Sequence, residues 1–164
     1  MEHGAAPRQP GTPVGQGAEM TDVSAGHRDV TDAAVRGAVE ALLSEAFWCH
    51  DHGMIDEQLA LYAPGFEVRT PGGTFRGEAE YRQFLHGRHG PDEFSMHYVT
   101  NVRVVAVDAE HVTFRYYLLN PLQNVAAVGG GDAFGVAEGC DVAAWDEGRL
   151  HFVERELTVR TILR

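Results

Sequence analysis

Residues 94–120 read FSMHYVTNVRVVAVDAEHVTFRYYLLN, and this stretch decides the predicted fold. It holds two long runs rich in valine and aromatic residues, and both runs are typical of β-strands. Between them lie Asp108, Ala109 and Glu110, a short polar segment that predicts a turn. Two long strands joined by a short turn pair antiparallel, so the second half of the chain is expected to be an antiparallel sheet.

The remaining C-terminal sequence extends this pattern into a meander. Residues 121–132, PLQNVAAVGGGD, predict a flexible loop, because three consecutive glycines have little local preference. Residues 133–145, AFGVAEGCDVAAW, predict a strand, and residues 146–148, DEG, a tight hairpin turn. Residues 149–160, RLHFVERELTVR, predict the last strand.

The N-terminal half has helical patterns instead. Apolar residues of the first segment recur at helical spacing and form one stripe: Val35, Val39, Leu42, Ala46 and Cys49. Asp29 or Thr31 is a candidate N-cap for this helix, and Gly53 is a candidate C-cap.

Two further helices and one short strand follow the first helix. Residues 55–63, IDEQLALYA, predict a second helix that stops at Pro64-Gly65, and residues 66–70, FEVRT, predict a short strand. Residues 77–90, GEAEYRQFLHGRHG, predict a third helix. Helices that precede a run of strands favour an α+β fold, with the helices on one face of an antiparallel sheet.

Length and composition limit the function classes. The 164 residues suit one domain, which we place at residues 29–164; residues 1–28 are rich in glycine, proline and polar residues and predict a disordered extension. The net charge of -11 argues against nucleic acid and anionic membranes as partners. No apolar run approaches the roughly 20 residues of a membrane span. With no secretory signal pattern, we expect a cytoplasmic protein.

Four segments in this order carry a resemblance to a known family: residues 50–68, 72–85, 96–118 and 145–157. Together they resemble the nuclear transport factor 2-like superfamily, in its SnoaL-like branch, over roughly residues 30 to 162. The resemblance implies a cone-shaped, curved antiparallel sheet wrapped around three N-terminal helices, with a pocket at the open end and a homodimer through the outer sheet face. The family includes scytalone dehydratase, ketosteroid isomerase, polyketide cyclases, epoxide hydrolases and noncatalytic subunits of ring-hydroxylating dioxygenases.

The resemblance also suggests catalytic positions. Residues 49–63 are similar to the scytalone dehydratase segment that carries a catalytic Tyr-Asp pair, which places His50 and Asp51 there. His97 takes the position of that family's first catalytic histidine, whereas Tyr116 and Thr70 stand where it has a second histidine and a pocket tyrosine. Only Asp51 and His97 match, so the same substrate is not expected.

The chemistry of the residue types supports an acid/base site. An aspartate that accepts a hydrogen bond from one imidazole nitrogen of His97 fixes its tautomer, and the other nitrogen can act as base or acid. Tyr116 could donate a hydrogen bond to a substrate carbonyl or leaving hydroxyl. We therefore name Asp51, His97, His50 and Tyr116 as catalytic candidates. Candidates for the pocket wall are Trp48, Tyr62, Thr70, Asn101, Phe114 and Leu118, although Asn101 could instead tie backbone near a bend of the sheet.

Structural roles compete with these functional ones. His97 and Tyr116 could be core residues, and Asp51 could cap local backbone, since it lies off the apolar stripe on the side expected to face solvent. The row of small residues at 133, 135, 137 and 139 makes room either for a ligand or for a helix.

A metal site is not predicted, because His50 and His52 point roughly 200° apart on a helix. No cofactor is expected either. A carboxylate-based isomerase is also disfavoured, since Thr70 and Ala46 stand where ketosteroid isomerase has its base and its tyrosine.

The sequence leaves three functions open. The first is an acid/base enzyme, a dehydratase, cyclase or isomerase that acts on a small apolar oxygenated molecule in natural-product biosynthesis. The second is a noncatalytic dioxygenase subunit. The third is a protein of the same fold that binds a small ligand without turnover.

Overall fold

The computed structural model describes residues 33–88, 96–122 and 133–163. The predicted disordered extension and most of the predicted glycine-rich loop lie outside these ranges. The described elements, in chain order, are α1 (Ala33–Asp51), α2 (Ile55–Leu59), β1 (Tyr62–Thr70), β2 (Gly73–Arg76), α3 (Gly77–Arg88), β3 (Tyr98–Val107), β4 (His111–Leu122), β5 (Ala133–Asp146) and β6 (Arg149–Leu163).

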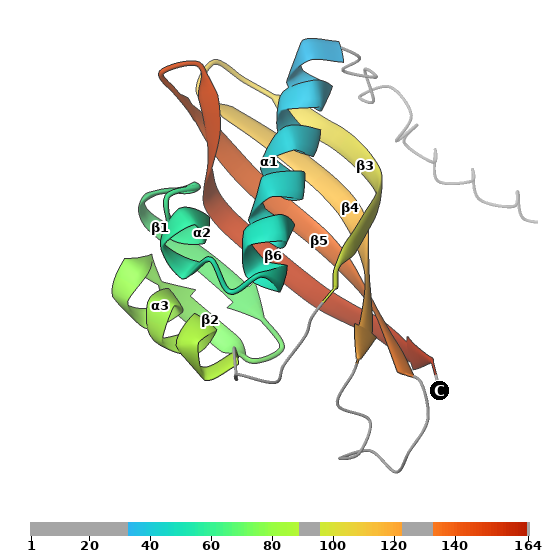
Figure 1. Cartoon of the computed structure of the whole chain (residues 1–164). Helices are drawn as coiled ribbons and strands as arrows, with labels where there is room; N and C mark the ends of the chain where they lie inside the picture. Colours follow the sequence, from blue (N-terminus) through green and yellow to red (C-terminus); the bar gives the residue numbers. More distant parts are fainter. Residues whose placement is uncertain (1–32, 89–95, 123–132, 164) are drawn as a thin grey trace, which may run out of the picture.

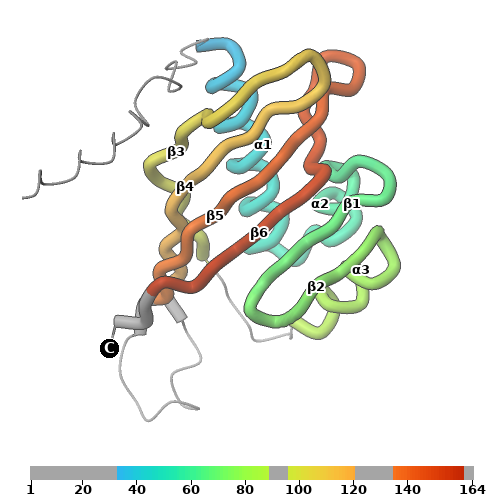
Figure 2. Tube along the Cα trace, turned by 180° about the vertical axis from the view of Figure 1, so that it is seen from behind, coloured from blue at the N-terminus to red at the C-terminus, as the bar shows by residue number. Residues whose placement is uncertain are grey.

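The predicted α+β architecture is present, with helices on one side of a curved, unclosed sheet. The strand order is β2-β1-β6-β5-β4-β3, and β3 to β6 form the predicted antiparallel meander. Figure 1 shows α1 crossing the inner face of the sheet, with α2 and α3 beside β1 and β2. Figure 2, the view from behind, shows the outer face of β3 to β6 with no described helix over it. One pair departs from the prediction, because β1 runs parallel to β6.

The core lies between α1 and the inner face of the sheet. The apolar stripe of α1 is buried there, with Val39, Ala46 and Cys49 at 0% exposure. Phe114 of β4 and Phe152 of β6 are also fully buried in this core. The alternation of β-strand side chains therefore sends one set of residues toward α1, where the site lies.

The segment after α1 differs from its predicted helix. Helix α2 ends at Leu59, and β1 begins at Tyr62 and continues through Pro64 and Gly65. Its pairing with β6 shifts register between Tyr62 and Glu67, and Gly65 has a φ of 76° there. Pairing with β6 thus overrides the helical pattern, and the bulge accommodates a proline that has no N–H to donate. Strand β2 was not predicted.

Bulges shift the inward face of two strands. In β3 the register with β4 changes between Thr100 and Arg103, and Asn101 has a φ of 55°. In β6 the register with β5 changes at Val153, because Val142 pairs with Glu154 and Ala143 with Phe152. Each extra residue reverses which side chains face inward beyond it.

In the described ranges, no helix is both long and apolar enough to cross a membrane. The homodimer and the cytoplasmic location stay predictions.

Candidate active site

The structure places Asp51 and His97 in direct contact. Oδ1 of Asp51 lies 2.5 Å from Nδ1 of His97, and Oδ2 accepts the backbone N–H of His97 at 2.8 Å. The side chains are 12% and 8% exposed. Both carboxylate oxygens bind one residue, so the C-terminal end of α1 is fixed to the start of β3. The position of Asp51 on α1 predicted a solvent-exposed side chain, but this contact with His97 buries most of it.

The second nitrogen of the His97 ring also has a partner. Asn120, on the inward face of β4, places Nδ2 2.8 Å from Nε2 of His97. A carboxylate on Nδ1 and an amide N–H on Nε2 assign the neutral tautomer with its proton on Nδ1. Phe47 stacks on the ring, with centroids 5.1 Å apart. The His97 ring is therefore held on three sides, and its Nε2 faces the amide of Asn120.

His50 and Gln58 form the next part of the site. The His50 ring meets the His97 ring edge to face, with centroids 5.0 Å apart. Gln58, of α2, is 2% exposed, and its Nε2 lies 3.5 Å from Nδ1 of His50. Oε1 of Gln58 has no hydrogen-bond partner among the described residues. A buried acceptor of this kind is costly unless a ligand or water completes it.

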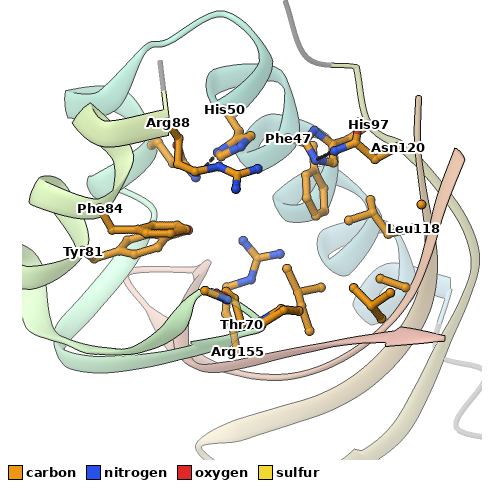
Figure 3. A pocket seen from close by; sticks show the side chains of 17 residues that line it. Phe47, His50, Thr70, Tyr81, Phe84, Arg88, His97, Leu118, Asn120 and Arg155 are labelled. Carbon is orange, nitrogen blue, oxygen red and sulfur yellow. Dashed lines mark hydrogen bonds between the residues drawn. The ribbon is translucent and has the colours of Figure 1, made fainter. Parts of the chain in front are cut away.

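A buried arginine faces this group from the sheet. Arg155 of β6 is 3% exposed, and its Nε donates to Oδ2 of Asp141 at 2.9 Å. Its Nη1 donates to the hydroxyl of Tyr62 at 2.9 Å, and its Nη2 donates to the hydroxyl of Tyr116 at 2.8 Å. A guanidinium has five N–H groups. Two of them therefore have no partner in the described part of the chain, and Figure 3 shows the guanidinium pointing into the cavity.

The groups beneath Arg155 hold it in this orientation. Tyr116 donates to Asp141 at 3.0 Å, and the backbone N–H of Glu156 donates to Asp141 at 3.3 Å. Burial raises the pKa of the Tyr116 hydroxyl well above its usual value, so it stays protonated and can donate. Burial also raises the pKa of the Asp141 carboxyl, against the opposing effect of Arg155. The carboxylate thus depends on Arg155 for its charge.

These side chains surround a cavity of about 310 Å³. Its floor comes from β5 and β6, one wall from α1 and β4, and the facing wall from the turn after β1 and from α3 (Figure 3). Aromatic and aliphatic side chains make most of the surface, and Asn120, Gln58, Thr70, two histidines and two arginines supply most of the polar groups. An apolar cavity with few convergent polar groups is typical of a small-molecule site.

Four predicted site residues line this cavity, and a fifth, Asp51, contacts one of them. His97, His50, Thr70 and Leu118 line it, and Asp51 contacts His97 from behind. Gly135 and Ala137, from the row of small residues, also line it.

The other predicted residues lie elsewhere. Tyr116 is not a cavity residue, because the ring is fully buried beneath Arg155. Tyr62 supports Arg155 in the same way, and Phe114 is 0% exposed in the core. Trp48 is 59% exposed, since it lies on the face of α1 opposite the buried stripe. Asn101 faces outward because the bulge in β3 reverses the alternation at that residue.

Sequence reasoning missed Arg155, Asn120, Gln58 and Arg88. The sequence could have identified Asn120, because it continues the inward-facing alternation of Tyr116 and Leu118 on β4 by one step. Arg155 had a signal too: the apolar residues of β6 change parity between Phe152 and Leu157, which indicates a bulge. Arg155 shares the parity of Leu157, so it faces inward.

Within the described ranges, no three histidine, cysteine or acidic side chains lie close enough together to hold a metal ion.

Comparisons with known proteins agree with this architecture. The family model described as SnoaL-like domain matches residues 31–156. No curated protein sequence matches the chain significantly. A provisionally named scytalone dehydratase from Novosphingobium aromaticivorans superposes with a TM-score of 0.70 at 19% identity, over 80% of this chain and 87% of that one. The hexachlorocyclohexane dehydrochlorinase LinA-type3 from Novosphingobium barchaimii superposes with a TM-score of 0.66 at 19% identity, over 80% of this chain and 90% of that one.

A provisionally named aromatic ring hydroxylase from Novosphingobium aromaticivorans gives a TM-score of 0.65 at 14% identity, over 78% of this chain and 91% of that one. At such identities the likeness shows the cone-shaped fold, and this fold carries several different functions.

Proposed function

We propose that this chain, which belongs to the SnoaL-like domain family, is an acid/base enzyme acting on a small, largely apolar oxygenated molecule. Dehydration, cyclisation and isomerisation can each begin with removal of a proton from carbon next to a carbonyl, and the site suits that step. The observation that carries the proposal is the contact between Asp51 and Nδ1 of His97, with the His97 ring at the wall of a cavity.

His97 is the proposed base. The proton on Nδ1 stays with Asp51 as its hydrogen-bond partner, and Nε2 takes the proton from carbon. The carbanion electrons form a carbon–carbon double bond, and in a dehydration the carbon–oxygen bond at the next carbon breaks. The leaving hydroxide then takes the proton from Nε2 and departs as water, which restores the neutral ring. Asp51 stabilises the imidazolium that exists between the two steps.

Arg155 is the proposed electrophile. Its guanidinium points into the cavity, where the two N–H groups that have no partner among the described residues can donate to the substrate carbonyl as negative charge develops on the oxygen. Because Asp141, Tyr62 and Tyr116 already hold the guanidinium, it need not reorganise during the reaction. Such donors act strongly in a site that excludes water.

Asn120 must change partner during the cycle. Its Nδ2 donates to Nε2 of His97 in the structure, so this amide blocks the lone pair that acts as base. A 180° turn of the amide presents Oδ1 instead, and Oδ1 can accept the N–H that Nε2 gains from the substrate. The same side chain then stabilises the protonated ring.

The test is exchange of a carbon-bound proton, measured with 2-tetralone, a bicyclic ketone with acidic C–H groups. NMR in D₂O reports the rate at which its α-protons are replaced. The wild-type protein is expected to accelerate exchange, and His97→Gln to lose about 10²- to 10⁴-fold of that acceleration, the usual contribution of a positioned base. His52→Gln is the matched control, because His52 is exposed and stacks on Trp48 outside the cavity. Equal rates for wild type and His97→Gln would refute the proposal.

A protein that binds a ligand without turnover is the second candidate. The specific observation in its favour is the bond between Asn120 and Nε2 of His97, since a pair that is already satisfied can serve recognition alone. In that case 2-tetralone binds with no acceleration of exchange in any variant.

A further inference from the structure

The charges around the cavity differ from those of the whole chain. The protein carries 24 acidic and 13 basic residues, yet the residues that line the cavity include no aspartate or glutamate. They include Arg88, Arg155, His50 and His97. The cavity thus presents basic groups and no carboxylate of its own within an acidic protein, and such a lining suits an anion.

Arg88 is the group that the proposed reaction does not use. It lies in the last turn of α3, and Figure 3 shows its side chain entering the cavity from the side opposite Arg155. In the described ranges no ion pair involves Arg88, whereas Arg82 of the same helix pairs with Asp56 and Glu78. Arg88 does have a ring contact, with its guanidinium carbon 5.8 Å from the centroid of Phe84. Arg88 can therefore pair with an anion that enters the cavity.

The wall beside Arg88 is aromatic. Phe84 lies nearly parallel to Tyr81, with an angle of 16° and centroids 5.9 Å apart, and it stacks on Phe75 at 4.3 Å. Both Phe84 and Tyr81 line the cavity. A planar ring can pack against this aromatic wall, and a charged substituent on that ring then lies next to Arg88.

Gln58 is an independent sign that a polar ligand completes the site. Its side chain is 98% buried and lines the cavity, yet its Oε1 lacks a partner in the described structure. It can accept a hydrogen bond from a ligand, which an apolar molecule would not offer.

We propose that the ligand is a planar aromatic or enolic carboxylic acid, whose carboxylate pairs with Arg88 and whose ring packs against the wall formed by Phe84 and Tyr81. This assignment rests on the proposed function, because it names the substrate class of the same cavity. Arg155 then addresses the reacting carbonyl, and Arg88 neutralises the carboxylate without taking part in proton transfer. Arg88 therefore decides which molecules bind.

Calorimetric titration with two matched probes tests this assignment. The probes are 2-naphthoate, a planar carboxylate, and 2-naphthamide, its neutral counterpart of nearly equal shape. The wild-type protein is expected to bind the naphthoate about tenfold more tightly, the factor that one charge-assisted hydrogen bond supplies. Added salt should weaken the binding of the naphthoate and leave the binding of the naphthamide unchanged, because only the naphthoate forms an ionic contact with Arg88.

Two arginine variants locate the effect. Arg88→Gln is expected to abolish the tenfold preference and leave naphthamide binding as it was. Arg82→Gln removes an equal charge from the same helix outside the cavity, and it should keep the preference. Both side chains are at the surface, so both variants should fold.

Three results would overturn the assignment: equal affinity for the two probes, a preference that survives in Arg88→Gln, or no binding of either probe at millimolar concentration. None of these needs turnover. The 2-tetralone exchange measurement uses a neutral probe and His97→Gln, so failure of the carboxylate assignment and failure of the acid/base function would be seen separately.

Discussion

Replacement of Asp141 by asparagine is expected to destabilise the protein strongly. Asp141 is 0% exposed and accepts hydrogen bonds from Arg155, Tyr116 and the backbone of Glu156. Asparagine has nearly the same shape, but it turns an NH₂ group toward one set of these donors and leaves the guanidinium without a counter-charge. Breaking a buried ion pair by removal of one partner costs about 3–5 kcal/mol. That is a large part of the roughly 5–15 kcal/mol by which a domain is stable.

The assay is urea unfolding at neutral pH, followed by tryptophan fluorescence and by circular dichroism. Glu156→Gln provides the matched control, because it makes the same chemical change at the next residue after Arg155. Its carboxylate is 50% exposed and lies 3.5 Å from Arg69, so this replacement should change the free energy of unfolding by about 1 kcal/mol or less.

A double variant separates loss of charge balance from loss of packing. Arg155→Met alone leaves Asp141 buried without its cation, whereas Asp141→Asn with Arg155→Met leaves no buried charge. The double variant should therefore lose less stability than the sum of the two single losses, with a coupling of about 0.5–3 kcal/mol. The reasoning is refuted if Asp141→Asn costs no more than Glu156→Gln, or if the two single losses simply add.

Two further predictions concern packing and reactivity. Gly139→Ala should destabilise the protein by about 1–3 kcal/mol in urea unfolding, because a Cβ there would lie 2.2 Å from the Tyr116 ring. Cys49 should resist iodoacetamide at neutral pH, as mass spectrometry of its peptide would show. Its thiol is 0% exposed, and burial, with a contribution from Glu45, raises its pKa, so little thiolate forms.

Both predictions have internal controls. Gly37→Ala is the opposite case, since a Cβ at Gly37 of α1 meets nothing within 4 Å. It should stabilise the helix by about 0.5–1 kcal/mol, and destabilisation at Gly37 would show that glycine loss as such explains the effect at Gly139. Cys49 should react once the protein is unfolded in urea; rapid reaction in the folded state would contradict its burial.

The predictable part of the fold rests on local signals. The meander from β3 to β6 follows from long apolar runs separated by short polar turns, and α1 follows from its stripe of apolar residues. The predicted helix over residues 55–63 was too long, because β1 forms by pairing with β6, which lies some 90 residues later in the chain. A pattern that reads as a helix locally cannot reveal a distant partner.

The site residues, too, were predictable only where the signal was local or came from the resemblance. The resemblance drew attention to Asp51 and His97, which the structure places 2.5 Å apart. Tyr116 was assigned the wrong surroundings, because strict alternation puts it on the inner face but says nothing of what covers it. Arg155 covers the Tyr116 ring. In a β6 strand with uninterrupted alternation from Phe152, Arg155 would face outward, and Glu154 and Glu156 would face inward.

The bulge at Val153 is therefore more than an irregularity of the sheet. With the extra residue, Phe152 and Arg155 both face α1, and the glutamates on either side of Arg155 face outward, where Arg69 binds them. Without it, one continuous alternation from Phe152 would bury two carboxylates and expose the cation. The cavity owes the guanidinium of Arg155 to this one inserted residue. The bulge also explains why Asp141, which is directly opposite Arg155 on β5, can be buried as a charged partner.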